Sequence, residues 1–213
     1  VVLYFREQLF TLLLGFTRSF AKEGQTEDSK LAWLIILATV PAGIAGLWLN
    51  DVIEQYSRSI LVIAVSSIVF SLFLYFADKP ERAVKDLHEL TWKTGLLIGI
   101  AQMLALIPGT SRSGVTMTVA LLCNLTRPAA ARFSFLLAVP IIGMSGLLKS
   151  IELYAVGTSG SEWLMLFYAA GLAAVVAFGC IHFFLQLIEK VGFLPFVIYR
   201  LGLGGLLLGI YFI

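Results

Sequence analysis

Long apolar segments alternate with short polar ones along this chain of 213 residues. Five of the apolar segments are long enough for a helix to cross about 30 Å of hydrocarbon at about 1.5 Å per residue. They comprise residues 31–49, 59–77, 130–148, 164–188 and 193–213. An outer-membrane barrel would instead show alternating strands of about ten residues. The pattern therefore predicts an all-α fold, a polytopic membrane helical bundle.

Two further apolar segments, residues 95–107 and 115–125, are each too short to cross the membrane. Between them lies the sequence PGTSRSG, residues 108–114, which we call the PGTSRSG segment. Its proline and two glycines interrupt the helix. We therefore expect a re-entrant helix–loop–helix over about residues 95–125. Two full crossings would leave the later segments in the same orientation, and only the segment lengths argue against them.

The distribution of Lys and Arg favours the hairpin over a single crossing. With a hairpin, most of the 15 basic residues fall on one side of the membrane, whereas a single crossing would move Arg127 and Lys190 to the other side. Because basic residues concentrate in cytoplasmic loops, we expect the hairpin to enter from the cytoplasmic side. The most charged stretch, residues 78–93, is expected to be a loop with an interfacial helix anchored by Trp92.

A weak internal symmetry relates residues 31–77 to residues 164–213. Each is a pair of spans, and the first spans end alike, in VIEQ (residues 52–55) and LIEK (residues 187–190). On the predicted topology the two pairs run in opposite directions, so the hairpin is expected to be part of an inverted repeat. Residues 1–213 are expected to form a single integral membrane domain. The start resembles the end of a transmembrane helix (residues 1–5, then Arg6) without a Met or a signal peptide, so we expect an N-terminal truncation.

Composition excludes a soluble globular domain. The chain is 59% hydrophobic and 13% charged, with a mean hydropathy of +0.94, whereas a soluble domain has about 25% charged residues. Cys123 and Cys180 lie in apolar segments without metal-ligand spacing, so we interpret both as small buried side chains. His88 and His182 are distant from the PGTSRSG segment in the sequence, and we expect neither to be catalytic.

The PGTSRSG segment has the residues of an oxyanion site. Arg112 lies in a strongly apolar region, where its charge is costly unless it faces protein, water or an anion. Gly109 and Gly114 allow a sharp turn that presents N–H groups, and the following helix directs its positive dipole end at the loop. Hydroxyls complete a ring of neutral donors, and one of them could be a nucleophile if a base is near. They belong to Thr110, Ser111, Ser113 and Thr116.

Alternative roles remain for three residues. Arg112 could pair with a carboxylate on another helix or extend to the interface, but all 13 acidic residues fall in loops or at segment ends. Gln102 could line the site or form a hydrogen bond between helices. Arg200, seven residues into the last span, could be structural or a second phosphate contact, and we favour the structural role.

Two stretches, GIAQMLALIPGTSRSGVTMTVALL followed by AARFSFLLAVP, resemble the undecaprenyl-diphosphate phosphatase family, also called bacitracin-resistance proteins. The closing LIEKVGFLPFVIYRLGLG resembles the C-terminal region of that family. The resemblance implies hydrolysis of a C55 polyprenyl diphosphate to the monophosphate, which recycles the lipid carrier for cell-wall synthesis. It also implies an inner-membrane location in bacteria, and it is compatible with a homodimer.

The resemblance also assigns roles to residues. Arg112 and Ser111 are expected to be catalytic and to contact the diphosphate, and a divalent cation, Mg or Ca, is expected to assist. From the pattern of the residues themselves, the expected substrate-binding residues are Gly109, Thr110, Ser113, Gly114 and Gln102. A second motif of the family, paired glutamates followed by a Ser-Ser-Thr-Gly-His run, is absent from residues 1–213. We therefore expect the metal ligands and the acid–base groups to lie outside this chain, which would be incomplete or inactive alone.

Two functions of different classes fit this pattern. The first is a membrane phosphatase acting on a lipid diphosphate. The second is an anion or lipid-phosphate transporter or binding protein that uses the same broken-helix site. The two differ in whether a base and a metal lie opposite the PGTSRSG segment.

Overall fold

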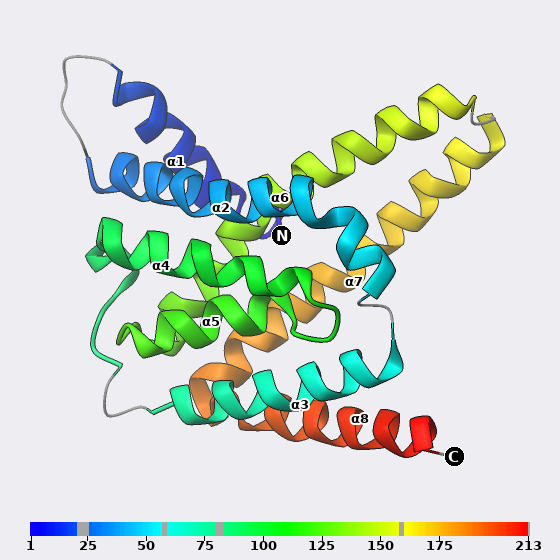
Figure 1. Ribbon diagram of the computed structural model, residues 1–213. Helices are drawn as coiled ribbons and strands as arrows, with labels where there is room; N and C mark the ends of the chain where they lie inside the picture. The colour runs from blue at the N-terminus through cyan, green and yellow to red at the C-terminus, as the bar shows by residue number, and fades with distance from the viewer. Residues whose placement is uncertain (21–25, 57–58, 80–82, 158–159, 213) are drawn as a thin grey trace.

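The computed structural model describes residues 1–20, 26–56, 59–79, 83–157 and 160–212, and its elements there are helices (Figure 1). The helices are α1 (Arg6–Arg18), α2 (Glu27–Tyr56), α3 (Ile60–Ala77), η2 (Leu87–Glu89), α4 (Trp92–Gln102), η3 (Met103–Leu106), α5 (Arg112–Leu122), α6 (Arg127–Val156), α7 (Gly160–Val191) and α8 (Leu194–Phe212). Apart from these, Lys85 and Leu125 form an isolated bridge.

The predicted spans are confirmed. Five helices, α2, α3, α6, α7 and α8, are long and apolar enough to cross a membrane. Prolines lie inside α2 and α6, at Pro41 and Pro140, which membrane helices tolerate. The chain is therefore an all-α, multi-pass membrane bundle.

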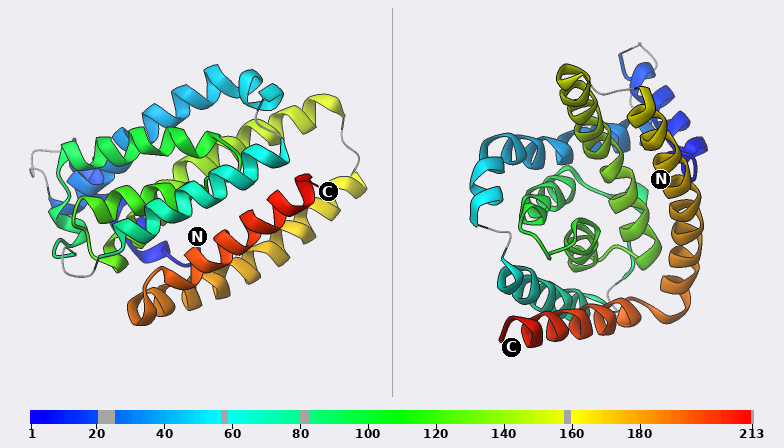
Figure 2. Two further views of the ribbon diagram at one scale, coloured as in Figure 1. Left: turned by 60° about the horizontal axis from the view of Figure 1, so that its bottom comes forward. Right: turned by 90° about the vertical axis from the view of Figure 1, so that its right-hand side faces the viewer.

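The hairpin of α4 and α5 lies at the centre of the bundle. Viewed from the end, these two helices are surrounded by α2, α3, α6, α7 and α8 (Figure 2). The same views show α3 and α8 side by side, while the distal parts of α6 and α7 project away from the body (Figures 1 and 2). Apolar side chains along the projecting part of α7 are exposed, as suits a helix that faces lipid.

Glycines bring the helix backbones close together. A Cβ added at Gly99 of α4 would lie 2.5 Å from the carbonyl oxygen of Ala38 in α2. A Cβ at Gly204 of α8 would lie 3.1 Å from the carbonyl oxygen of Ala64 in α3. Small residues allow such approaches between membrane helices. They hold the hairpin against α2 and hold α8 against α3.

An ion pair at one end of the bundle joins three helix ends. Asp78, directly after α3, accepts hydrogen bonds from the Arg127 side chain at 2.6 and 3.1 Å. The N–H group of Phe193, directly before α8, donates to the same carboxylate at 2.9 Å. Because the Asp78 side chain is only 9% exposed, solvent screens this pair weakly. The pair therefore fixes the starts of α6 and α8 relative to the end of α3.

Asp78→Ala is expected to lower the free energy of unfolding by about 2–4 kcal/mol, because it leaves Arg127 and the Phe193 N–H without their acceptor. Thermal unfolding in detergent micelles measures the change. The matched control is Glu152→Ala, which removes an exposed ion pair with Lys149 and should cost less than about 1 kcal/mol. Equal destabilisation by the two variants would contradict this assignment.

Three expectations differ from the structure. Residues 1–5 do not end a helix: they form turns, and α1 begins at Arg6 after the buried Phe5. In the described part of the loop, residues 78–79 and 83–93, the single turn η2, capped by Asp86, takes the place of the expected interfacial helix, and Trp92 is the first residue of α4. Cys180 is exposed rather than buried, because its helix α7 faces outward.

Three expectations about organisation stay predictions. The side chains of residues 52–55, on which the internal symmetry depends, lie outside the described part of the chain. The inverted repeat is therefore not tested. The cytoplasmic entry of the hairpin and the single-domain organisation are not tested either.

Candidate active site

The PGTSRSG segment lies at the turn of the central hairpin. The α4 and α5 helices have 11 residues each, too few to cross the membrane, and η3 and the first residues of the segment connect them. The predicted helix–loop–helix is thus confirmed. Its turn is directed into the bundle rather than away from it (Figure 2).

The start of α5 presents free N–H groups at this turn. Ser111 is the N-cap residue, and its hydroxyl accepts a hydrogen bond from the Gly114 N–H at 3.2 Å. Within the described part of the chain, the N–H groups of Arg112 and Ser113 have no acceptor, and they lie at the positive end of the helix dipole. This is the geometry of an anion-binding helix start.

Ser111 has a backbone conformation that is unusual for a residue with a side chain. Its φ is 67° and its ψ is 113°, and such conformations cost about 1–3 kcal/mol. Strain of this kind persists only where surrounding contacts enforce it. It sets the direction in which the Ser111 hydroxyl and the first turn of α5 point.

Gly109 is enclosed by α3. Its φ is 91°, and an added Cβ would collide with the hydroxyl of Ser66 and the backbone of Ile63. The Ser66 hydroxyl donates to the carbonyl oxygen of Pro108 at 2.6 Å. Close packing against α3 therefore requires glycine at this position.

Arg200 of α8 holds the same loop from the other side. Its Nη2 donates to the carbonyl oxygens of Gly109 at 2.7 Å and Thr110 at 2.9 Å, with a longer contact to Ser67 at 3.4 Å. Its Nε donates to the hydroxyl of Ser71 at 2.8 Å. Arg200 therefore holds the backbone of the loop, which is a contact of the structural kind that was favoured for it.

Arg112 is half-buried at the first position of α5. Within the described residues it has neither a carboxylate partner nor a hydrogen bond from its side chain, so the alternative of a paired Arg112 finds no support there. A guanidinium in this position has a fork of donors available for a ligand. The geometry thus favours an anion as its partner.

The remaining polar side chains of the site divide into two groups. The hydroxyl of Thr110 donates to Ile107 inside the loop, and that of Thr116 is bonded to Ser134 at 2.6 Å. Gln102 is only 2% exposed, yet neither atom of its side-chain amide has a partner among the described residues. An unpaired buried amide costs about 1–3 kcal/mol, so the Gln102 amide has donors and an acceptor left unused, whereas the two threonine hydroxyls are engaged.

Acid–base groups are not found beside the PGTSRSG segment in the described structure. His182 contacts Tyr4 at 3.3 Å and Gln186 at 3.1 Å on α7, and His88 of η2 lies 3.8 Å from Glu27. Neither histidine contacts the segment. Burial raises the pKa of the Cys123 thiol, partly opposed by Lys85, which makes this cysteine a poor nucleophile near neutral pH.

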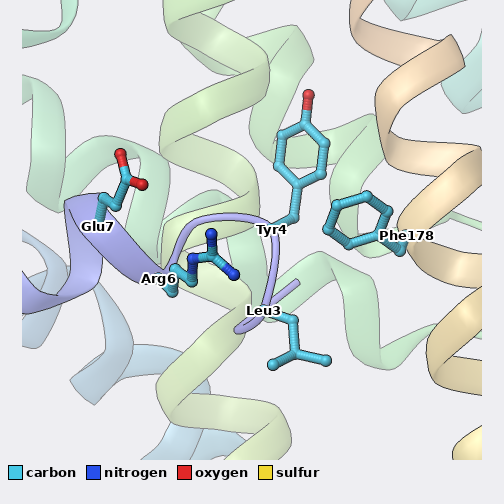
Figure 3. A pocket seen from close by; sticks show the side chains of 5 residues that line it. All are labelled: Leu3, Tyr4, Arg6, Glu7 and Phe178. Atoms are coloured by element: carbon cyan, nitrogen blue, oxygen red, sulfur yellow. The ribbon is translucent and has the colours of Figure 1, made fainter.

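One surface pocket lies away from the site. It lies between the start of the chain and α7 and is lined by Leu3, Tyr4, Arg6, Glu7 and Phe178 (Figure 3). None of the PGTSRSG residues lines it, so this pocket does not extend the candidate site.

A family model supplies the decisive comparison. The model described as "Bacitracin resistance protein BacA" matches residues 1–206. The chain belongs to the BacA family. Undecaprenyl-diphosphatase 1 of Pseudoalteromonas translucida (strain TAC 125) is 51% identical over 204 residues, which cover 96% of this chain and 76% of that protein. Undecaprenyl-diphosphatase of Hahella chejuensis (strain KCTC 2396) is 50% identical over 212 residues, 99% of this chain and 79% of that protein.

In this BacA-family chain, the serines of α3 are site residues that were not predicted from the sequence. Ser66, Ser67 and Ser71 all lie buried in an otherwise apolar span, and each has a contact with the PGTSRSG segment or with Arg200. Serines within a membrane helix commonly form hydrogen bonds to neighbouring helices. The clustering of three serines in one apolar span could have indicated a contact between helices, but it did not indicate which segment they would contact.

Proposed function

We infer that this BacA-family chain hydrolyses undecaprenyl diphosphate, releasing phosphate and the monophosphate that is reused as the lipid carrier for cell-wall synthesis. About 50% identity to undecaprenyl-diphosphatases over nearly the whole chain supports the reaction. The structural observation that carries the proposal is Arg112, half-buried and without a protein partner, at the start of α5. A diphosphate is an anion that a guanidinium and free helix N–H groups can bind.

In the proposed complex, Arg112 binds diphosphate oxygens and neutralises charge that develops as the phosphorus–oxygen bridge breaks. The N–H groups of Arg112 and Ser113 and the serine hydroxyls donate to the same group. Ser111 is the proposed catalytic hydroxyl, because the strained backbone directs it at the helix start. The proposed substrate contacts also include Gly109, Thr110, Gly114 and Gln102; for Thr110, the backbone is the better candidate because its hydroxyl donates to Ile107.

The lipid tail is proposed to lie along the apolar, outward-facing helices of this multi-pass protein. The bacterial inner membrane is the proposed location, because the lipid carrier is reused there. A homodimer stays a prediction.

A divalent cation is proposed as an assisting group, but the described residues do not fit it. Among them, no cluster of three or more His, Cys, Asp or Glu side chains is placed to hold a metal ion. The PGTSRSG segment offers hydroxyls, N–H groups and a guanidinium, which suit an anion rather than Mg²⁺ or Ca²⁺. We therefore assign no step to a metal on these residues.

The transporter alternative uses the same anion site, since broken helices that bind anions near the membrane midplane are typical of transporters. The close relatives, named as diphosphatases, favour the enzyme. The decisive test uses the protein that carries this chain, at its natural length, with undecaprenyl diphosphate in detergent micelles. We expect one phosphate released per lipid, measured colorimetrically, together with the monophosphate, measured by chromatography. Diphosphate binding without phosphate release would favour transport.

A further inference from the structure

Arg200 of α8 connects two helices to the backbone of the PGTSRSG segment. Its guanidinium uses Nε for the Ser71 hydroxyl of α3 and Nη2 for the carbonyl oxygens of Gly109 and Thr110. These acceptors are 90 to 129 residues away in the sequence. The bond to Ser71 fixes the guanidinium against α3, and the two bonds from Nη2 fix the carbonyls of the loop against the guanidinium.

The two carbonyl bonds determine where the following N–H groups point. A trans peptide is planar, with its N–H directed opposite to its carbonyl. The carbonyl of Thr110 shares a peptide plane with the N–H of Ser111, so the bond to Arg200 turns that N–H away from α8. The next rotatable bond after this peptide is the N–Cα bond of Ser111, where the φ angle is 67°. Arg200 is therefore positioned to maintain the strained conformation on which the direction of Ser111 and Arg112 depends.

The charges near the first turn of α5 also favour a bound anion. Besides the loop carbonyls, the Arg200 guanidinium lies beside the first turn of α5, where its Nη1 would be 3.3 Å from a Cβ added at Gly114. Arg112 begins the same helix. The positive end of a helix dipole disfavours a cation, and neither arginine has a carboxylate partner in the described structure. An anion at this point removes the conflict.

We propose that Arg200 is a positioning residue of the phosphatase site, which acts on the diphosphate through Ser111 and Arg112 by fixing the carbonyls of Gly109 and Thr110. The proposal rests on the proposed function. It assigns a role in turnover to a side chain of the last helix, far from the PGTSRSG segment in the sequence. Ser71 supports this role by holding the Nε side of the guanidinium.

The test compares Arg200→Gln and Arg200→Lys with wild type, using phosphate release from undecaprenyl diphosphate by folded protein. We expect Arg200→Gln to lower kcat about 100-fold with KM changed less than about 3-fold, because the geometry of the reacting groups is lost. The kcat of Arg200→Lys should be about 10-fold higher than that of Arg200→Gln. An ammonium can still donate to the carbonyls but lacks the forked donors of a guanidinium. The matched control is Tyr199→Phe, an exposed neighbour on α8, which should keep the wild-type kcat.

A merely structural role would reduce the amount of folded protein while kcat per folded molecule stays at the wild-type value, and that result would overturn the proposal. If Arg200→Gln does not fold, Ser71→Ala decides, because it leaves the guanidinium in place and removes its Nε acceptor; the only other hydrogen bond lost among the described residues is the local one from the Ser71 hydroxyl to the Ser67 carbonyl oxygen. We expect Ser71→Ala to lower kcat about 3- to 10-fold at constant KM. An unchanged kcat in Ser71→Ala would overturn the proposal. Absence of phosphate release by the wild type would instead contradict the proposed function.

Discussion

Arg112→Ala is expected to lower kcat/KM for phosphate release from undecaprenyl diphosphate by about 10²–10³-fold, the usual effect of removing one preorganised donor from a charge-stabilising site. Arg112 has no structural partner among the described residues, so the variant should fold normally. The loss would therefore reflect the missing interaction with the diphosphate. Initial rates at several substrate concentrations measure it.

Two further variants isolate the role of the guanidinium. Arg112→Lys keeps the charge but not the forked donors, and we expect an activity between wild type and Arg112→Ala. Arg132→Ala removes an exposed arginine from α6 and should keep wild-type activity. Arg112→Ala with a wild-type rate and a wild-type affinity for the diphosphate would exclude the anion site from both the phosphatase and the transporter hypotheses.

Gly109→Ala is expected to lower the free energy of unfolding by about 3 kcal/mol or more and to abolish phosphate release. The φ of 91° alone costs a residue with a Cβ about 1–3 kcal/mol. The added Cβ also collides with Ser66 and with the backbone of Ile63, which cannot rotate away. Relief of that collision would displace the loop from α3 and from Arg200.

Thermal unfolding and phosphate release, measured on the same detergent-solubilised sample, check both parts of the result. The matched control is Gly143→Ala: this glycine lies within α6, and a Cβ added there has nothing within 4 Å. Alanine favours a helix over glycine by about 1 kcal/mol, so the control should be neutral or slightly stabilising. A Gly109→Ala protein as stable and active as this control would show that the loop does not need its observed conformation.

The spans and the hairpin followed from the sequence because both depend on local properties. Five segments had the length and hydropathy of membrane helices, and the structure has a helix at each of them. Proline and glycine in the PGTSRSG segment placed the turn between two helices of 11 residues. The prediction was wrong for residues 1–5 and for the loop of residues 78–93, where a buried phenylalanine and a single capped turn set the local structure.

The candidate site was predictable only in part. Arg112 was recognisable because a charge without an acidic partner in an apolar region requires an anion or water. The sequence showed equally that Gln102 and Arg200 were polar residues within apolar segments, but not what they contact. The structure separates them: Arg200 is bonded to the loop carbonyls, while the Gln102 amide is buried and unpaired.

The sequence by itself determined that this protein is a helical membrane bundle with an arginine-bearing turn, because helix length, apolar composition and helix interruption are properties of neighbouring residues. Only the tertiary structure decided which side chains hold that turn. Ser66 of α3 and Arg200 of α8 contact it from 42 to 91 residues away in the sequence, and Ser71 of α3 in turn accepts a hydrogen bond from Arg200. Hydrogen bonds depend on distance and direction in space, and packing of α3 against α8 around the hairpin is what brings these groups together.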